Sequence, residues 1–339
     1  MSKKYTFTGE TMLSPDGTST LHKIVALKDF SDMRGDIEGG WIEKEENLSQ
    51  EGDCWVYSDA MVYGNATVKD NAVVCEEAIV RGNAMVYGDA FIEGTAEVYG
   101  NAQVYGNARV LDDAQVYGNA RVLDDAQVYG NARVYGSAHI CDNAKVYDDA
   151  VVYSDALIYG DAMVYGSSEV HDTAMIYGNA QVYDEASIKD NAKVFGDAKV
   201  YGSSEVHDIA MICDNAQVYD EASIGGNARV YDEASIRGTA QVYSNAQVYD
   251  EASIRDNAQV YGNAWVYGDA QVYGNAGVSD DAQVYGNAQV YDEASIEGTA
   301  KVYGHAMVYD EAIVRGNAIV TNDAVVFGKV ELSDDCRIL

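Results

Sequence analysis

The six residues Ala102-Gln103-Val104-Tyr105-Gly106-Asn107 are one copy of a unit that repeats along most of this 339-residue chain. From position 60 to position 324 every sixth residue is alanine, except for Ser168 and Ser204. Two positions after each small residue comes a branched aliphatic residue, from Val56 to Ile338, without an insertion or a deletion. Such a repeat overrides the usual estimate of domain number from chain length, because each repeat packs against its neighbours.

The period of six predicts one short strand and one corner per repeat. An α-helix needs apolar residues about every 3.6 positions, so this period with a central glycine or aspartate excludes a helix. Side chains alternate along a strand, so the alanine and the aliphatic residue share the inward side. The residue between them and the tyrosine after them then point outward. Pairs such as Gly-Asn, Asp-Asp and Asp-Glu follow, and these residues favour turns and tolerate a positive φ.

Three repeats that close into a triangle give an 18-residue coil of a parallel β-helix. In support, residues 166–188 recur nearly unchanged as residues 202–224, a shift of 36 residues or two whole coils. A tandem copy of twelve residues, 109–120 followed by 121–132, would instead rotate by one face, so repeats are interchangeable between faces. The 48 aliphatic positions predict about 16 coils. Solenoids with periods of five or nine residues are excluded by the spacing.

The first part of the chain does not follow the repeat. We expect residues 1–52 to form an N-terminal β cap and residues 53–339 to form the β-helix. Tyr5-Thr6-Phe7-Thr8 alternates like a strand, and Pro15-Asp16-Gly17 predicts a turn. Residues 21–27 would then return as the second strand of a hairpin. A cap is needed because the end of a solenoid exposes apolar core and unpaired strand edges.

The segment that joins this hairpin to the repeat is expected to belong to the cap as well. Residues 35–42 are interpreted as a glycine-punctuated turn that ends in two large apolar residues. Leu48 lies one register step before Cys54, which occupies the small inward position. We therefore expect the cap to end in a first, incomplete coil.

Composition excludes several classes of function. A net charge of −33 with a pI near 4.2 repels phosphate backbones, so ordinary nucleic-acid binding is not expected. No stretch approaches the ~18 apolar residues of a membrane span. The N-terminus lacks the apolar core of a secretory signal, so we expect a cytoplasmic protein with no membrane contact. The five cysteines have no paired spacing, which argues against a disulfide framework or a zinc motif.

The tyrosines suggest a binding surface. All 27 except Tyr5 directly follow an inward aliphatic residue, so they would stack every 18 residues into outward ladders. Such ladders could bind sugar rings, a partner or another copy of the chain. They would also stabilise neighbouring strands by ~0.2–1 kcal/mol per pair, and this interpretation is favoured because tyrosine occurs on all three faces. The ladder considered for binding comprises Tyr129, Tyr147, Tyr165, Tyr183, Tyr201 and Tyr219, and a second comprises Tyr231, Tyr249, Tyr267, Tyr285 and Tyr303.

Acidic residues concentrate at the corners: from residue 58 onward the corners hold 38 of the 55 acidic residues of the chain. Carboxylates at this spacing could hold Ca²⁺. Their alternation with uncharged corners is interpreted instead as relief of repulsion between solvated carboxylates. We therefore expect no metal and no cofactor. The acidic pairs that recur every second coil include Asp112-Asp113, Asp148-Asp149, Asp184-Glu185 and Asp220-Glu221.

The small–x–aliphatic hexad resembles the hexapeptide repeat of left-handed β-helix proteins, which are often acyltransferases. Within that group, Gly39-Gly40-Trp41-Ile42 and the stretch from Asn47 to Tyr57 look like the N-terminal signature of the YdcK-like proteins. That bacterial and phage-encoded set is often labelled as transferase or polymer-forming. The resemblance implies a left-handed helix with an N-terminal cap, a handedness that the spacing alone does not give. It supplies no catalytic motif.

An enzymatic function would require an irregularity in the repeat. Left-handed β-helix acyltransferases typically extend loops from their coils and use a histidine as general base. No loop is predicted after residue 53, and P-loop, G-x-S-x-G and dinucleotide motifs are absent from the sequence. The weak catalytic candidates are His139, His171 and His207, of which the last two are copies produced by the duplication of 36 residues.

Three hypotheses about function follow. The preferred one is a non-enzymatic structural or interaction scaffold, a rod that presents tyrosine ladders and acidic corners. The alternatives are an acyl-CoA-dependent enzyme of the hexapeptide-repeat acyltransferase type, and an acidic mimic of nucleic acid that binds a basic partner. Outward positions near the C-terminus are apolar, so we also expect self-association through the C-terminal coils. The residues for this contact are Met307, Ile313, Ile319 and Val325.

Overall fold

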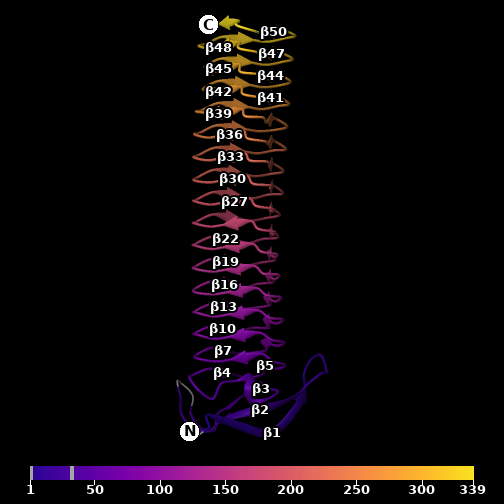
Figure 1. Cartoon of the computed structure of the whole chain (residues 1–339), viewed down its shortest axis with the longest axis vertical. Helices are drawn as coiled ribbons and strands as arrows, with labels where there is room; N and C mark the ends of the chain where they lie inside the picture. The colour runs from indigo at the N-terminus through magenta and orange to yellow at the C-terminus, as the bar shows by residue number, and fades with distance from the viewer. Residues whose placement is uncertain (1–2, 31–33) are drawn as a thin grey trace. The chain divides into compact units, whose positions relative to one another are not determined.

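The computed structural model describes residues 3–30 and 34–339. It divides into two compact units, Met1–His171 and Asp172–Leu339. The first unit begins with three longer strands, β1 (Tyr5–Leu13), β2 (Thr20–Ala26) and β3 (Glu38–Ile42), and the 3-10 helix η1 (Glu45–Asn47). The three longer strands lie at the lower end of the view, and short strands follow them along the chain (Figure 1).

The short strands repeat every six residues. In the first unit they run from β4 (Trp55–Val56) to β23 (Glu169–Val170), and in the second from β24 (Met175–Ile176) to β51 (Arg337–Ile338). Each strand covers two residues. The exceptions in the described part of the chain are β39 (Trp265–Tyr267), β42 (Gln283–Gly286) and β45 (Lys301–Gly304). The 48 strands from β4 to β51, three to a coil, confirm the predicted 16 coils.

Parallel pairing between coils confirms the 18-residue turn. Strand β12 (Gln103–Val104) pairs with β15 (Arg121–Val122), so Gln103 lies beside Arg121. The backbone N–H of Gln103 donates to the carbonyl of Ala120 at 2.9 Å. In each unit the strands fall into three parallel sheets, one for each side of a triangular coil. Each unit is therefore a triangular β-solenoid, while its left-handedness stays a prediction from the resemblance.

The inward half of each repeat forms the core. The alanines and aliphatic residues from Cys54 to Val320 are almost completely shielded from solvent. The two serines that replace alanine are buried as well, and each hydroxyl donates to the carbonyl three residues earlier. Ser168 Oγ lies 2.9 Å from the Tyr165 oxygen, and Ser204 Oγ lies 2.8 Å from the Tyr201 oxygen. These bonds satisfy the buried hydroxyls, which would otherwise destabilise the core.

The corners contain the predicted left-handed residues. Gly106 has a φ of 73° and Asp124, one coil later, has a φ of 60°. A Cβ atom on Gly106 would lie 2.7 Å from the backbone nitrogen of Asp124. Glycine at this corner thus provides both the positive φ and the close approach of two coils.

The cap confirms the predicted hairpin but corrects the segment after it. Strands β1 and β2 are antiparallel, with Tyr5 opposite Ala26. The turn predicted for residues 35–42 is confirmed at Gly35 and Asp36 but is wrong for Glu38–Ile42. These residues form β3, which pairs with β2 and also, in parallel, with β5 (Met61–Val62). A Cβ atom on Gly40 would lie 2.5 Å from the carbonyl oxygen of Ala60. This glycine therefore allows a strand to lie against the first coil rather than making a turn.

The incomplete coil before Cys54 is present, with a register that differs from the prediction. Leu48 forms a parallel bridge with Val68, 20 residues later, and is fully buried. It therefore takes the position of an inward aliphatic residue and not the small position expected from its distance to Cys54. The corner between Leu48 and Trp55 is accordingly two residues longer than the later corners.

A buried lysine joins the cap to the first coil. Lys4 is almost fully shielded, and its Nζ atom donates to the carbonyl oxygens of Cys54 at 2.9 Å and Gly52 at 3.2 Å. The Tyr5 hydroxyl donates to the Leu48 carbonyl at 2.7 Å. The first strand of the cap is thus tied by hydrogen bonds to the corner where the solenoid begins.

The cysteines and the apolarity of the helices bear on the class of protein. The five cysteines are free thiols, and Cys54 is the buried one. In the residues that the structure describes, no helix has the length and apolarity needed to cross a membrane.

We predict that Gly40→Ala destabilises the junction between cap and solenoid. The added Cβ would press on backbone atoms that cannot move aside, so the free energy of opening the first coils should fall by about 1–3 kcal/mol. Native-state hydrogen exchange of the amides around residues 55–62 measures this change. Gly35→Ala is the matched control, because the atom nearest to a Cβ at position 35 would be a backbone atom of Lys28, 3.8 Å away. Equal protection in the two variants would contradict the proposed close packing.

Candidate functional site

The tyrosines considered for binding form stacked ladders in both units. In the first unit Tyr147 stacks on Tyr129 and on Tyr165, with ring centroids 4.8 Å apart and ring planes within 2° of parallel. In the second unit Tyr201 stacks in the same way on Tyr183 and Tyr219, at 4.8 and 4.9 Å. Each tyrosine follows a two-residue strand, so the strand register places its ring directly beside the ring of the next coil. The predicted stacking is confirmed within each unit.

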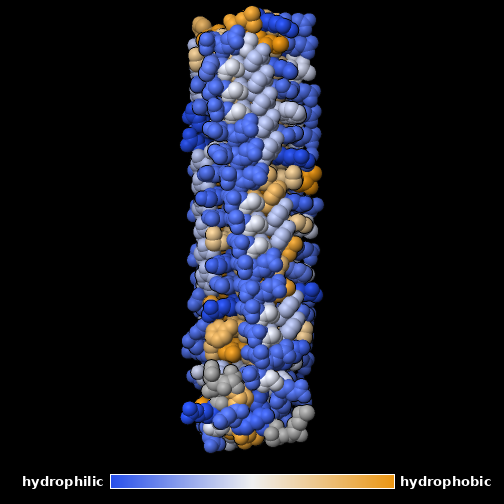
Figure 2. Space-filling model, turned by 90° about the vertical axis from the view of Figure 1, so that its left-hand side faces the viewer, coloured by the Kyte–Doolittle hydropathy of each residue, from blue (hydrophilic) through white to orange (hydrophobic). Residues whose placement is uncertain are grey.

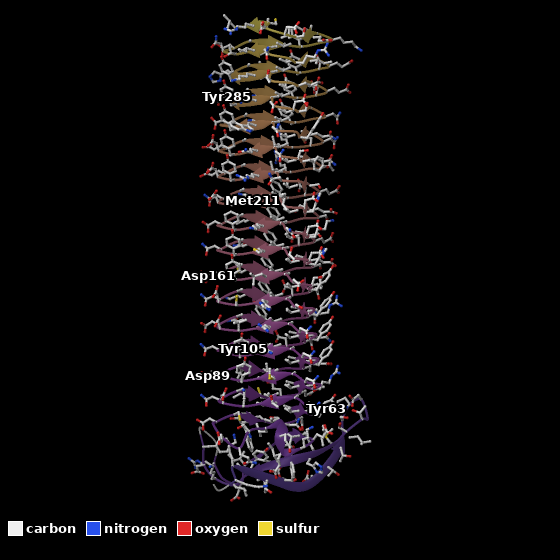
Figure 3. The ribbon with its side chains drawn as sticks, viewed as in Figure 1. Tyr63, Asp89, Tyr105, Asp161, Met211 and Tyr285 are labelled. Atoms are coloured by element: carbon white, nitrogen blue, oxygen red, sulfur yellow. The ribbon has the colours of Figure 1, made fainter. Side chains whose placement is uncertain are left out.

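The other predicted ladder also forms, and tyrosines stack at further positions. Tyr231 to Tyr303 give four successive contacts at 4.7–4.9 Å in the second unit. In the first unit Tyr99, Tyr117, Tyr135 and Tyr153 stack at 4.8–5.0 Å. Figure 3 shows Tyr105 and Tyr285 projecting outward from their coils.

The stacking decides what the ladders can bind. A sugar ring packs against the face of an aromatic ring, but here the two faces of each inner ring are turned toward the rings of neighbouring coils. Ring edges and phenolic hydroxyls remain at the surface. The ladders thus favour contact with polar or flat partner surfaces over stacking with sugars along their length.

The same packing makes the phenols weaker acids. Partial burial, and then the neighbouring phenols of Tyr129 and Tyr165, raise the pKa of Tyr147 to about 12. Burial and the phenols of Tyr231 and Tyr267 likewise raise the pKa of Tyr249 to about 12. The ladders are therefore neutral at the pH of a cell, and they add no charge to the acidic surface.

The acidic corners are exposed, as predicted, but they also form hydrogen bonds between coils. The Asp112 carboxylate accepts a hydrogen bond from the Gly130 N–H at 3.0 Å, and Asp148 accepts one from Gly166 at 3.2 Å. The alternation of aspartate with glycine, interpreted above as relief of repulsion, thus has an additional structural cause. Figure 3 shows Asp89 and Asp161 at the corners of their coils.

Asparagines form a second kind of ladder, which is not among the features predicted from the sequence. At the second corner position, each side-chain amide donates to the equivalent residue of the next coil. The Nδ2 to Oδ1 distances are 3.1 Å from Asn65 to Asn83, 2.9 Å from Asn83 to Asn101, and 3.0 Å from Asn101 to Asn119. The signal was present in the sequence as asparagine spaced by 18 residues.

The three histidines proposed as weak catalytic candidates do not form one site. His139 lies on β18 (His139–Ile140), where partial burial and then Arg121 lower its pKa. His171 follows β23 and stacks on Tyr153 at 4.8 Å. His207 follows β29 (Glu205–Val206), and its Nδ1 atom lies 3.0 Å from Asp208 Oδ2. The carboxyl of Asp208 has a lowered pKa because the Gly226 N–H, and to a smaller degree His207, stabilise its ionised form.

Shallow hollows lie between the corners of successive coils. One of 410 Å³ is bordered by Asp292, Glu293, Asp310, Glu311, Gly328 and Lys329. Another, of 330 Å³, is bordered by Thr173, Met175, Asn191, Lys193, Ile209 and Met211. Neither hollow has His139, His171 or His207 in its wall, so the catalytic candidates and these hollows do not coincide.

The fold and its surfaces define a β-solenoid repeat protein. The chain carries repeats of the family described as YdcK Beta solenoid repeat, and the expected resemblance to the YdcK-like proteins is confirmed. The matched segments are residues 60–76, 102–113, 114–125, 126–142, 156–172, 258–274 and 270–286.

A curated relative carries the same name. The uncharacterized acetyltransferase YdcK of Escherichia coli (strain K12) is 43% identical over 53 residues. That stretch covers 14% of this chain and 16% of the relative. Such a short match supports the repeat family, and it leaves the activity of the whole relative as a question for this chain.

We predict that the solenoid loses stability as the pH rises from about 10 to about 12. An ordinary tyrosine ionises near pH 10, and the folded ladder holds the pKa of Tyr147 at about 12. Folded protein therefore retains protons that the unfolded chain releases in this range, so the free energy of unfolding falls with increasing pH. Denaturant titrations at several pH values, together with the absorbance of tyrosinate, measure both effects.

Tyr147→Phe provides the control for this pH dependence. It keeps the stacked ring but removes the phenol whose pKa is raised to about 12, so the loss of stability between pH 10 and pH 12 should be smaller than in the wild type. If the tyrosines of the folded wild-type protein instead ionise at the ordinary pKa of tyrosine, the stacked ladder does not raise their pKa, and the prediction is contradicted.

Proposed function

We propose that this protein is a non-enzymatic scaffold that presents tyrosine ladders and acidic corners to other molecules. The observation that carries the proposal is the unbroken 18-residue register, in which the described coils from Cys54 to Ile338 contain no inserted loop. Without a loop, each outward side chain is bordered by its equivalents in adjacent coils. The surface is then a set of regular columns, which suits extended contact better than the enclosure of a small substrate.

The scaffold proposal includes self-association through the C-terminal coils. Val325, Phe327 and Val330 have exposed fractions of 42%, 56% and 43%, although they are apolar. With Val326, Leu332 and Ile338 they border a hollow of 390 Å³. Of the four residues expected to make this contact, Val325 is exposed, whereas Met307, Ile313 and Ile319 are half-buried. Figure 2 shows apolar side chains gathered on the last coils of the second unit.

A second copy of the chain is the partner that this apolar surface fits best. A net charge of −33 makes two copies repel each other over most of their surfaces. Near the apolar surface, however, two ion pairs form. Lys329 Nζ lies 2.9 Å from Glu311, and Arg315 forms an ion pair with Glu331. The local repulsion is thereby reduced where the apolar side chains could pack together.

We predict that the wild-type chain self-associates and that the double variant Val325→Ser, Phe327→Ser raises the dissociation constant at least about tenfold. Analytical ultracentrifugation over a range of concentrations measures this. Ile209→Ser is the matched control, because Ile209 is 51% exposed in the second unit but lies outside the C-terminal coils. A wild-type chain that stays monomeric at high concentration would overturn the self-association.

An acyl-CoA-dependent acyltransferase is the second candidate. It is supported by the name of the Escherichia coli relative and by the hexapeptide-type repeat. Against it, none of the three histidines lines the hollows of 410 and 330 Å³ named above, where a general base for a substrate bound there would be needed. The acidic mimic of nucleic acid stays a third hypothesis, supported by the net charge alone.

The two main candidates predict different results with acetyl-CoA. For a scaffold we expect no shift in melting temperature with CoA and no release of CoA from acetyl-CoA above the rate without protein. A thermal shift together with CoA release that His207→Gln abolishes would favour the acyltransferase and contradict the scaffold. His171→Gln serves as the comparison, because His171 is the duplicated counterpart of His207.

A further inference from the structure

His207 lies in a niche that a neighbouring glycine creates. A Cβ atom built on Gly225 would lie 2.2 Å from Cε1 and 2.7 Å from Nε2 of the His207 ring. The ring therefore rests against the backbone of the next coil, in the space that a side chain at position 225 would fill. Its side chain is only 24% exposed, which is low for an outward position.

The duplicated segment shows that this niche is particular to one copy. Residues 166–188 and 202–224 are nearly identical, so His171 and His207 are equivalent in sequence. The residue 18 positions later is Lys189 in the first copy and Gly225 in the second. Lys189 extends along the surface to Glu205, with 3.2 Å between Nζ and Oε2. The change from lysine to glycine thus frees the space that the ring of His207 occupies.

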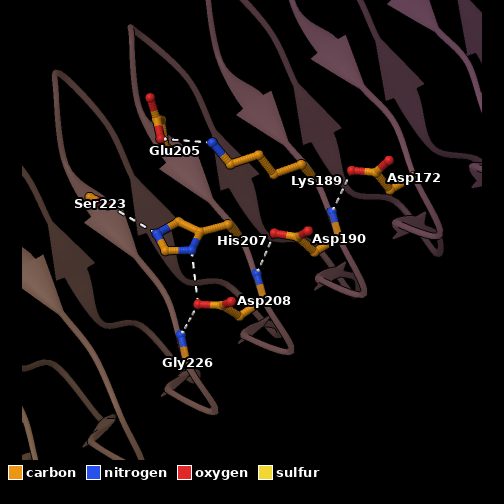
Figure 4. Close-up of polar contacts among 8 residues, drawn as sticks. All are labelled: Asp172, Lys189, Asp190, Glu205, His207, Asp208, Ser223 and Gly226. Atoms are coloured by element: carbon orange, nitrogen blue, oxygen red, sulfur yellow. Dashed lines mark hydrogen bonds and ion pairs between the residues drawn. The ribbon is translucent and has the colours of Figure 1, made fainter.

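Two carboxylates face the imidazole in the same corner. Asp208 Oδ2 lies 3.0 Å from His207 Nδ1, and Asp190 contributes a carboxylate from the preceding coil (Figure 4). One ligand atom from each of the three residues lies within 4.8 Å of the others. Exposed side chains that move freely rarely keep three ligand atoms this close together. The site therefore depends on hydrogen bonds that hold the two carboxylates in position.

Hydrogen bonds from the backbone hold both carboxylates in place. The Asp208 N–H donates to Asp190 Oδ2 at 3.1 Å, and the Gly226 N–H donates to Asp208 Oδ2 at 2.7 Å. On the other side of the ring, His207 Nε2 lies 3.4 Å from the Ser223 hydroxyl. When a cation replaces the proton on Nδ1, a proton on Nε2 can donate to that hydroxyl, and the lone pair of Nδ1 points toward the cation between it and the carboxylates. In metal sites, the histidine nitrogen that does not bind the ion commonly donates its proton to an acceptor of this kind, which fixes the orientation of the ring.

We propose that Asp190, His207 and Asp208 bind a divalent transition-metal ion such as Zn²⁺. One imidazole nitrogen with two carboxylates is a donor set that zinc accepts, whereas Ca²⁺ and Mg²⁺ prefer oxygen alone. The two carboxylates also neutralise the charge of the ion. This site departs from the expectation of no metal, which considered the acidic corners without the imidazole.

The acidic corner alone does not carry this proposal. Aspartates also occupy the same corner of three successive coils at Asp214, Asp232 and Asp250. There the N–H of Asp232 approaches the carboxylate of Asp214, and the N–H of Asp250 approaches that of Asp232. Within the described residues, the cluster of three metal-ligating groups is found at His207 and not in that second column. The imidazole and its glycine niche distinguish the site.

The proposed ion would remain accessible from solvent. The corner opens onto a hollow of 570 Å³, whose border includes Asp190, Asn191, Asp208, Ile209 and Asn227. Three protein ligands leave at least one coordination position of Zn²⁺ for water or for a donor group of another molecule. The site would thus add a localised attachment point to the second unit, independent of the proposed self-association.

Isothermal titration of the full chain with Zn²⁺, after treatment with a chelator, tests the proposal. We expect one site per chain with an affinity that excess Ca²⁺ does not reduce. His207→Gln should weaken binding more than about tenfold, because it removes the nitrogen ligand. His171→Gln should leave the affinity unchanged. X-ray absorption of the zinc-loaded protein should show one nitrogen ligand together with oxygen ligands.

Gly225→Ala tests the niche while keeping all three ligands. Its methyl group would displace the ring of His207, so zinc binding should weaken about as much as in His207→Gln. Position 225 does not have a positive φ, and alanine there meets a flexible side chain, so the fold should be retained, as a thermal melt can verify. Zinc binding that is absent from the wild type, or that His207→Gln and Gly225→Ala leave unchanged, would overturn the proposal.

Discussion

The backbone hydrogen bonds between coils determine which side chains lie beside each other in each unit. Gln103 N–H donates to the Ala120 carbonyl in the first unit, and Gln247 N–H donates to the Ala264 carbonyl in the second, both at 2.9 Å. Parallel strands lie about 4.8 Å apart, so this pattern places each side chain directly beside the residue 18 positions away. A residue's environment is therefore set by its column through successive coils more than by its neighbours in sequence.

Columns explain why several surface features that suggest binding have a structural role. Tyr129 and Tyr147 cover each other's faces, Asn83 and Asn101 share an amide hydrogen bond, and the carboxylate of Asp112 accepts from a backbone N–H. All of these contacts join identical positions of adjacent coils, and they stabilise the parallel sheets. A specific function is then best sought where a column changes residue type, as at His207 and Gly225.

The inward half of the fold was predictable because the burial of alanine and valine depends on strand alternation alone. The cap was harder, since Gly39 and Gly40 acquire their role from backbone that only the folded chain brings near them. Leu48 was assigned to the wrong inward position because the corner that follows it contains two additional residues. In the metal-ligand cluster, the sequence shows His207 as a duplicate of His171, but the difference between the two copies that matters lies 18 residues later, at Lys189 and Gly225. A comparison of the two copies by column would have found it.

The interchangeable hexad also has a consequence for how such a chain can change its length. Duplication of 36 residues, as in 166–188 and 202–224, returns each residue to its own column, so a ladder is extended and diverges only by later substitution. Duplication of twelve residues, as in 109–120 and 121–132, preserves the inward pattern but moves outward residues to another face. Slippage during replication by any multiple of six therefore maintains a folded core, whereas only multiples of 18 preserve a surface. Selection can in this way alter the length and the surface of the protein almost independently.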